Sequence, residues 1–154
     1  MARRIYIDTF VVAGCIDETF GAWSNRLMDE IRDGWWLAVV SDLTERELLL
    51  LPSHARQIVN RLPGRAIERV KMDRKAKALA EKYIFQEVVS QDQIAVAQHV
   101  ATATVSRVDV FVSWNFRQIV NLDRIRAFNA VNLMAGYPML EIRTPREVFH
   151  EENL

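Results

Sequence analysis

The chain has 154 residues, half of them hydrophobic, which is the size of one domain with a full core. Its 20 basic and 20 acidic residues cancel, so no global field draws the chain to nucleic acid or to an anionic membrane. The single cysteine, Cys15, excludes an internal disulfide and a zinc site built from cysteines, and it is typical of a reducing cytoplasm.

The chain contains no basic-then-apolar leader and no apolar run close to the roughly 18 residues that a membrane span needs. We therefore expect a soluble cytoplasmic protein. No repeat, low-complexity segment or linker interrupts the pattern, so residues 1–154 are expected to form a single domain.

The apolar pattern alternates between strands and helices along the chain. In chain order we expect a strand at 4–8 with an apolar exit at 10–15, a helix at 19–32, a strand at 35–40, helices from 42 to Pro52 and at 53–61, a strand at 66–72, helices at 73–83 and 90–106, a strand at 108–112, a helix at 122–134, a strand at 140–143 and a helical turn from Thr144. This alternation predicts an α/β fold with three α/β/α layers around a mostly parallel sheet.

Polar side chains stand at the ends of two of these strands. Asp8 follows the first strand, and a carboxylate buried there needs a metal ion or hydrogen bonds; capping of a turn is the alternative. Ser113 and Asn115 follow the strand at 108–112, where parallel sheets bind ligands, although both are also common turn formers. Asp109 begins that strand, which favours capping or a loop contact.

Other candidates lie on helices. Glu47 belongs to the inward stripe of its helix, whereas Glu45 points about 200° away and is expected in solvent. Asp92 starts the helix at 90–106, where the helix dipole alone accounts for an acid. His99 lies in an Ala/Val face of that helix, and a hydrogen-bonded core histidine is the ordinary interpretation.

One segment is densely basic and is either a solvated face or a surface that meets phosphates. Its members are Arg61, Arg65, Arg69, Lys71, Arg74, Lys75 and Lys77. The sequence has no glycine-rich phosphate loop, no nucleophile elbow and no paired-histidine metal motif, which disfavours those reaction classes.

Four segments together resemble the PIN-domain family, most closely the small bacterial PIN toxins of toxin–antitoxin pairs. They are Ile5-Tyr-Ile-Asp8-Thr9, Ser41-Asp-Leu-Thr44-Glu-Arg-Glu47-Leu, His99-Val-Ala-Thr-Ala and Asp109-Val-Phe-Val-Ser113-Trp-Asn115-Phe116-Arg-Gln-Ile-Val-Asn121. The likeness spans essentially the whole chain, and the last segment is the most specific.

The resemblance implies a divalent-metal endoribonuclease whose acidic residues gather at the carboxyl edge of a parallel sheet. Carried over by position, the expected site residues are Asp8, Glu47, Asp109 and the turn Ser113-Trp-Asn115, with Asp92 as a further metal ligand. Mg²⁺ or Mn²⁺ is the implied cofactor, and a metal-activated water attacking an RNA phosphodiester is the implied reaction. The implied partners are RNA, a cognate antitoxin and a second copy of the chain.

One departure from the family leaves two mechanisms open. Val96 stands where the family has an aspartate three residues before its histidine, and Gln118 replaces another family histidine. Asp92, one helical turn earlier, either substitutes for the lost acid or is a simple helix-start residue. The chain is accordingly an active metal-dependent ribonuclease or a catalytically impaired PIN-like module that binds a protein or RNA partner without cleavage.

Two further expectations concern other architectures and assembly. A flavodoxin-like receiver or phosphatase shares the layers, but its acids are distributed differently from those of this chain. The sequence predicts more apolar surface than one domain needs, at Trp35, Trp36, Tyr137 and residues 48–51. This surface is in line with the homodimer that the resemblance implies.

Overall fold

The computed structural model describes residues 2–149, in which five parallel strands form one sheet of order β3-β2-β1-β4-β5. The strands are β1 (Arg3–Ile7), β2 (Trp36–Ser41), β3 (Ile67–Val70), β4 (Val110–Val112) and β5 (Ile142–Arg143). The central strand β1 has β2 on one side and β4 on the other, so the strand order reverses between β1 and β4.

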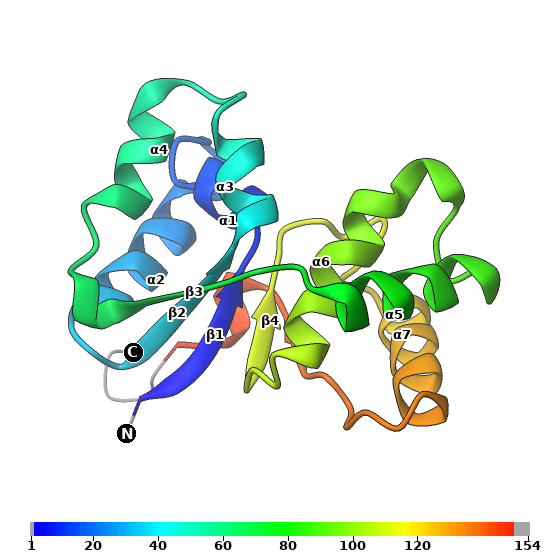
Figure 1. The fold of residues 1–154 in the computed structure, drawn as a ribbon. Coiled ribbons are helices and arrows are strands. Elements are labelled where there is room, and N and C mark those ends of the chain that lie inside the picture. Colours follow the sequence, from blue (N-terminus) through cyan, green and yellow to red (C-terminus); the bar gives the residue numbers. More distant parts are fainter. Residues whose placement is uncertain (1, 150–154) are drawn as a thin grey trace.

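Helices cover both faces of the sheet (Figure 1). The helices are α1 (Thr9–Gly14), α2 (Gly21–Arg32), α3 (Asp42–Leu48), α4 (Ser53–Asn60), α5 (Arg74–Phe85), α6 (Ile94–Val105) and α7 (Leu122–Met134), with short 3₁₀ helices η1 (Gly64–Ala66), η2 (Gln91–Gln93) and η3 (Pro145–Glu147). Helices α1, α2 and α4 pack on one face, and α5, α6 and α7 pack on the other. The expected three-layer α/β/α architecture is confirmed.

Alternation along β1 divides the core into two clusters. Ile5 and Ile7 belong to the cluster under α1, α2 and α4, whereas Tyr6 between them belongs to the cluster under α5, α6 and α7. All three side chains are fully buried. Burial on both faces is the reason why the strands of a parallel sheet read as nearly continuous apolar runs.

Two predicted elements differ from the structure in kind or continuity, and others are shorter than expected: the helix from residue 42 ends at Leu48, and the last strand spans only Ile142–Arg143. The apolar exit at 10–15 is a helix, α1, because the carboxylate of Asp8 accepts a hydrogen bond from the Val11 N–H and caps it. The helix predicted at 90–106 is divided, since residues 91–93 form the 3₁₀ helix η2 and α6 begins only at Ile94. The cap predicted at Ser41 is confirmed, because its hydroxyl accepts from the Thr44 N–H.

The apolar surface differs in part from the prediction. Trp36 and Leu48 are buried in the core, while Leu49 is 63% exposed and Leu50 is 88% exposed. The partners of Trp36 include the carboxylate of Glu30, which accepts from its indole N–H at 3.1 Å. Within residues 2–149, no helix combines the length and the apolar character required to cross a bilayer.

Candidate functional site

The site lies at the carboxyl edge of the sheet, where the strand order reverses. In the parallel pairing of β1 with β4, Ile7 lies opposite Val112, so the residues that follow them, Asp8 and Ser113, emerge side by side. Crevices at such reversal points are the usual ligand sites of open parallel sheets. The hydroxyl of Ser113 lies close enough to the carboxyl group of Asp8 to act on its pKa.

Asp8 is a buried carboxylate, with only 2% of its surface exposed. Burial disfavours the charged form and raises the pKa of Asp8 to about 6, although the charge of His99 and hydrogen bonds from Ser113 and the Val11 N–H act in the opposite direction. Among the ion pairs of the described residues, none includes Asp8. A carboxylate held in this way is poised to gain a cation.

Glu47 reaches the same edge from α3. Its Oε1 atom accepts hydrogen bonds from the Thr9 hydroxyl at 3.0 Å and from Nε2 of His99. Partial burial acts to raise the pKa of Glu47, but the hydrogen bond and charge of His99, followed by the Thr9 hydrogen bond, outweigh burial and lower it. Because both hydrogen bonds fall on Oε1 and the side chain is 39% exposed, the carboxylate keeps capacity for a further partner.

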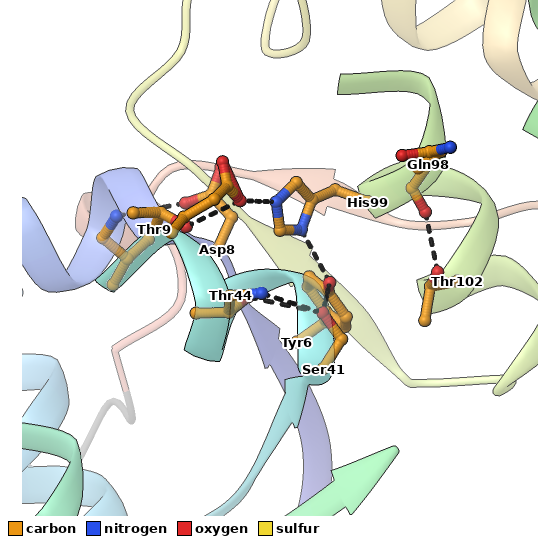
Figure 2. Close-up of polar contacts among 10 residues, drawn as sticks. Tyr6, Asp8, Thr9, Ser41, Thr44, Gln98, His99 and Thr102 are labelled. Atoms are coloured by element: carbon orange, nitrogen blue, oxygen red, sulfur yellow. Dashed lines mark hydrogen bonds and ion pairs between the residues drawn. The ribbon is translucent and has the colours of Figure 1, made fainter. Parts of the chain in front are cut away.

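A buried hydrogen-bonded chain extends from Glu47 into the core. Figure 2 shows its members His99, Tyr6, Ser41 and Thr44. Nδ1 of His99 lies 2.7 Å from the hydroxyl of Tyr6, which lies 2.7 Å from the hydroxyl of Ser41. The Ser41 hydroxyl in turn accepts from the Thr44 N–H at 3.3 Å. Burial raises the pKa of Tyr6, so its phenol remains protonated.

Sequence reasoning treated His99 as a hydrogen-bonded core histidine, and the structure confirms that it is buried and bonded through both ring nitrogens. It did not identify Tyr6, Ser41 and Thr9 as members of the same cluster. The sequence did offer a signal for this cluster, because Thr9 lies just after β1 and Ser41 lies at the end of β2. The carboxyl ends of parallel strands meet at one edge of the sheet.

Asp109 lies at the opposite edge of the sheet, and we correct its assignment as a metal ligand. Its carboxylate accepts from the backbone N–H of Arg4 at 2.7 Å, beside the amino end of β1. Asp8 follows the other end of that strand, about 13 Å away at the usual rise per residue. The structure therefore does not bring these two aspartates together.

Asp92 also makes its contacts away from the acidic pair, which is Asp8 and Glu47. It lies in η2, is exposed, and accepts a hydrogen bond from the hydroxyl of the adjacent Ser90. Val96, one turn further along, is buried against the apolar cluster under α5, α6 and α7. No described contact joins Asp92 to Asp8 or Glu47, and the described contact of α6 with this pair is the one from His99 to Glu47.

Ser113 and Asn115 play different parts. Ser113 is fully buried beside Asp8, and its hydroxyl also accepts from the Asn115 N–H at 3.0 Å. The side chain of Asn115 accepts from the Gln118 N–H at 3.0 Å and so shapes the turn after β4. Of the two, Ser113 contacts the site directly.

The oxygen donors fit one hard cation but not two. Within residues 2–149, no three or more His, Cys, Asp and Glu side chains are grouped so as to hold a metal ion. One Mg²⁺ ordinarily takes one or two carboxylates and completes its shell with water and substrate phosphate oxygens. The buried Asp8 and the partly exposed Glu47 meet that smaller requirement.

The architecture is that of a PIN-like α/β/α fold. Solved structures of similar fold include VapBC2 from Rickettsia felis bound to a DNA fragment from its promoter, at 10% identity and a TM-score of 0.54, covering 92% of this chain and 98% of that chain. DNA-bound VapBC from Salmonella typhimurium is similar at 17% identity and a TM-score of 0.54, covering 94% of this chain and 99% of that one. No family model and no curated protein matches the sequence. At these identities the likeness confirms the fold that the sequence resemblance implies.

Proposed function

We propose that this protein is a divalent-metal-dependent endoribonuclease, the toxin of a toxin–antitoxin pair, with Asp8 and Glu47 as the ligands of one Mg²⁺ or Mn²⁺. The observation that carries the proposal is the convergence of a desolvated aspartate and a hydrogen-bonded glutamate where the strand order reverses. The fold neighbours are VapBC toxin–antitoxin complexes, in which VapC is a PIN-domain ribonuclease, and this supports the class.

The residues of the chain prepare this site before any ligand arrives. The Val11 N–H and Ser113 fix the carboxyl group of Asp8, while Thr9 and His99 fix Glu47. Such fixed oxygens orient an ion without reorganisation at the moment of reaction. A bound divalent ion supplies a water of lowered pKa and stabilises charge that develops on the phosphate.

The basic segment is the proposed contact for the RNA backbone. All seven of its arginine and lysine residues, between Arg61 and Lys77, are exposed. Lys71 directly follows the carboxyl end of β3, and the neighbouring Met72 N–H bonds Asp42 at the start of α3, the helix that carries Glu47. Arg61 and Arg65 precede β3 and Arg69 pairs with Glu45, so the part of the segment at the edge of the acidic crevice begins at Lys71. Positive charge at that edge favours a polyanionic substrate although the net charge is zero.

The proposed protein partners are an antitoxin and a second copy of the chain. The similar structures are complexes with DNA, which supports a partner of the antitoxin kind. Exposed apolar side chains such as Leu50, Phe85 and Met134 offer surface for association.

A second candidate function is favoured by one specific observation. Val96 occupies the position of the third family acid, and the described residues contain no group of three acidic or imidazole ligands. If two carboxylates do not suffice, the protein is a PIN-like module that binds a protein or RNA partner without cutting RNA.

Calorimetric titration of Mn²⁺ into the EDTA-treated protein near neutral pH separates these candidates. Binding in the micromolar range that is lost in Asp8→Asn and retained in Asp109→Asn supports the metal site. The control is matched because Asp109 is an aspartate of the same sheet at its opposite edge. Metal-dependent cleavage of structured RNA by the wild type then supports the ribonuclease, whereas absence of binding heat in the wild type supports the impaired module.

A further inference from the structure

His99 is the contact between α6 and the acidic pair, and its ring is held on both sides. Its side chain is 7% exposed, Nε2 faces Glu47 of α3, and Nδ1 faces Tyr6 of β1. A glutamate side chain is ordinarily ionised near neutral pH, and an ionised carboxylate can only accept hydrogen bonds. Nε2 of His99 therefore carries the hydrogen of this bond.

The core orients the imidazole of His99 from its Nδ1 side. The Tyr6 hydroxyl bonds Nδ1 at 2.7 Å, and the two rings meet edge to face with centroids 5.9 Å apart. Tyr6 is itself stacked on Phe111 of β4 and bonded to Ser41 of β2. Side chains from three adjacent strands thus hold the donor that points at Glu47.

Glu47 needs this support more than Asp8 does. Asp8 is buried and bonded to the first turn of α1, whereas Glu47 is a longer side chain and is 39% exposed. Thr9 and His99 both bond Oε1 and restrain a side chain that is otherwise free to change rotamer. Position 96 is a valine, and the described residues contain no third acidic ligand beside Asp8 and Glu47.

We infer that His99 is a positioning residue, which holds the Glu47 carboxylate for the cation through an Nε2–H whose direction is set by Tyr6. The inference rests on the proposed function, since it concerns the ligands of that same site. It assigns to α6 a hydrogen-bond donor to Glu47, three residues after Val96. Partners of this outer kind change metal affinity about 10- to 100-fold when they are removed.

Two amide variants separate the two ring nitrogens. The amide nitrogen of His99→Gln lies near the position of Nε2 and can still donate to Glu47, whereas that of His99→Asn lies near Nδ1 and reaches only toward Tyr6. Both substitutions are polar, and both remove the aromatic ring. Mn²⁺ affinity is measured by calorimetry on each full-length variant, with thermal unfolding in EDTA as the test of folding.

The expected result is that His99→Asn loses about 10- to 100-fold in Mn²⁺ affinity while His99→Gln stays within about threefold of the wild type. Equal affinities in the two variants overturn the inference while wild-type binding leaves the proposed function in place. No Mn²⁺ binding by the wild type overturns both. If either amide variant fails to fold, Tyr6→Phe replaces it, because it keeps the packing and removes only the hydroxyl; a wild-type affinity there also overturns the inference.

Discussion

The burial of Asp8 predicts that replacing this aspartate by asparagine stabilises the metal-free protein at neutral pH. The folded-state pKa is about 6, against 3.8 for the unfolded chain, and the side chain is 2% exposed. A raised folded-state pKa means that the folded protein binds the proton more tightly. Asp8 therefore costs no stability below pH 3.8, and the cost grows until the pH passes about 6.

The magnitude follows from the size of the shift. A displacement of about two pKa units corresponds to roughly 3 kcal/mol at pH 7.5, where the folded protein must hold the charged form. Asp8→Asn removes that charge and keeps an oxygen that can cap α1 through the Val11 N–H. We expect the free energy of unfolding of the variant to be higher than that of the wild type by about 3 kcal/mol at pH 7.5. Near pH 4 the difference should be close to zero.

Urea unfolding in EDTA, followed by tryptophan fluorescence at several pH values, measures this difference directly. The difference between the unfolding free energies of the variant and the wild type cancels the contribution of groups that titrate equally in both proteins. Added Mn²⁺ is expected to raise the stability of the wild type but not of the variant, because only a bound ligand shifts the unfolding equilibrium. A stability difference that does not change with pH, or a variant less stable at pH 7.5, would refute the reasoning.

Three other substitutions test different parts of the structure. Gly14→Ala is expected to lower the free energy of unfolding by about 1–3 kcal/mol in urea, because the added Cβ would lie 2.7 Å from the indole nitrogen of Trp114. The control is Gly21→Ala, which should not destabilise the protein because the nearest atom to its added Cβ is 3.5 Å away. Val96→Asp should raise Mn²⁺ affinity about tenfold or more in calorimetry while lowering metal-free stability, since the site is buried; Val96→Asn, which adds no charge, should not raise the affinity. Lys71→Gln should reduce the salt dependence of RNA binding by about one unit of the logarithmic slope, and an unchanged slope would contradict the proposed RNA surface.

Local pattern was sufficient for most of the elements. The helix expected at 122–134 coincides with α7, and the cap at Ser41 and the strand before it are where the sequence places them. These features depend on neighbours in the chain, on apolar period and on side chains that bond the next N–H groups. The α1 helix was missed because a run of six apolar and small residues has no clear period.

The site was predicted only in part, because the local pattern does not show which residues meet at one edge of the sheet. Asp8 and Ser113 were proposed because each follows a strand, whereas Glu47 was proposed from the inward stripe of its helix and from the family resemblance. Asp109 was assigned to the metal although it begins its strand, and the parallel register sends it to the opposite edge. Membership of an edge is a property of strand direction and order, which pairing across the sheet decides.

The sequence by itself determined the layered α/β class and the strand that Asp8 follows. Only the tertiary structure decided that His99 meets Glu47, 52 residues away in the chain, and that Tyr6 directs the ring between them. It also decided that Asp8 is desolvated enough to raise its pKa. Periodicity and capping arise from local contacts, whereas burial and hydrogen bonds between distant side chains exist only once the helices have packed on the sheet.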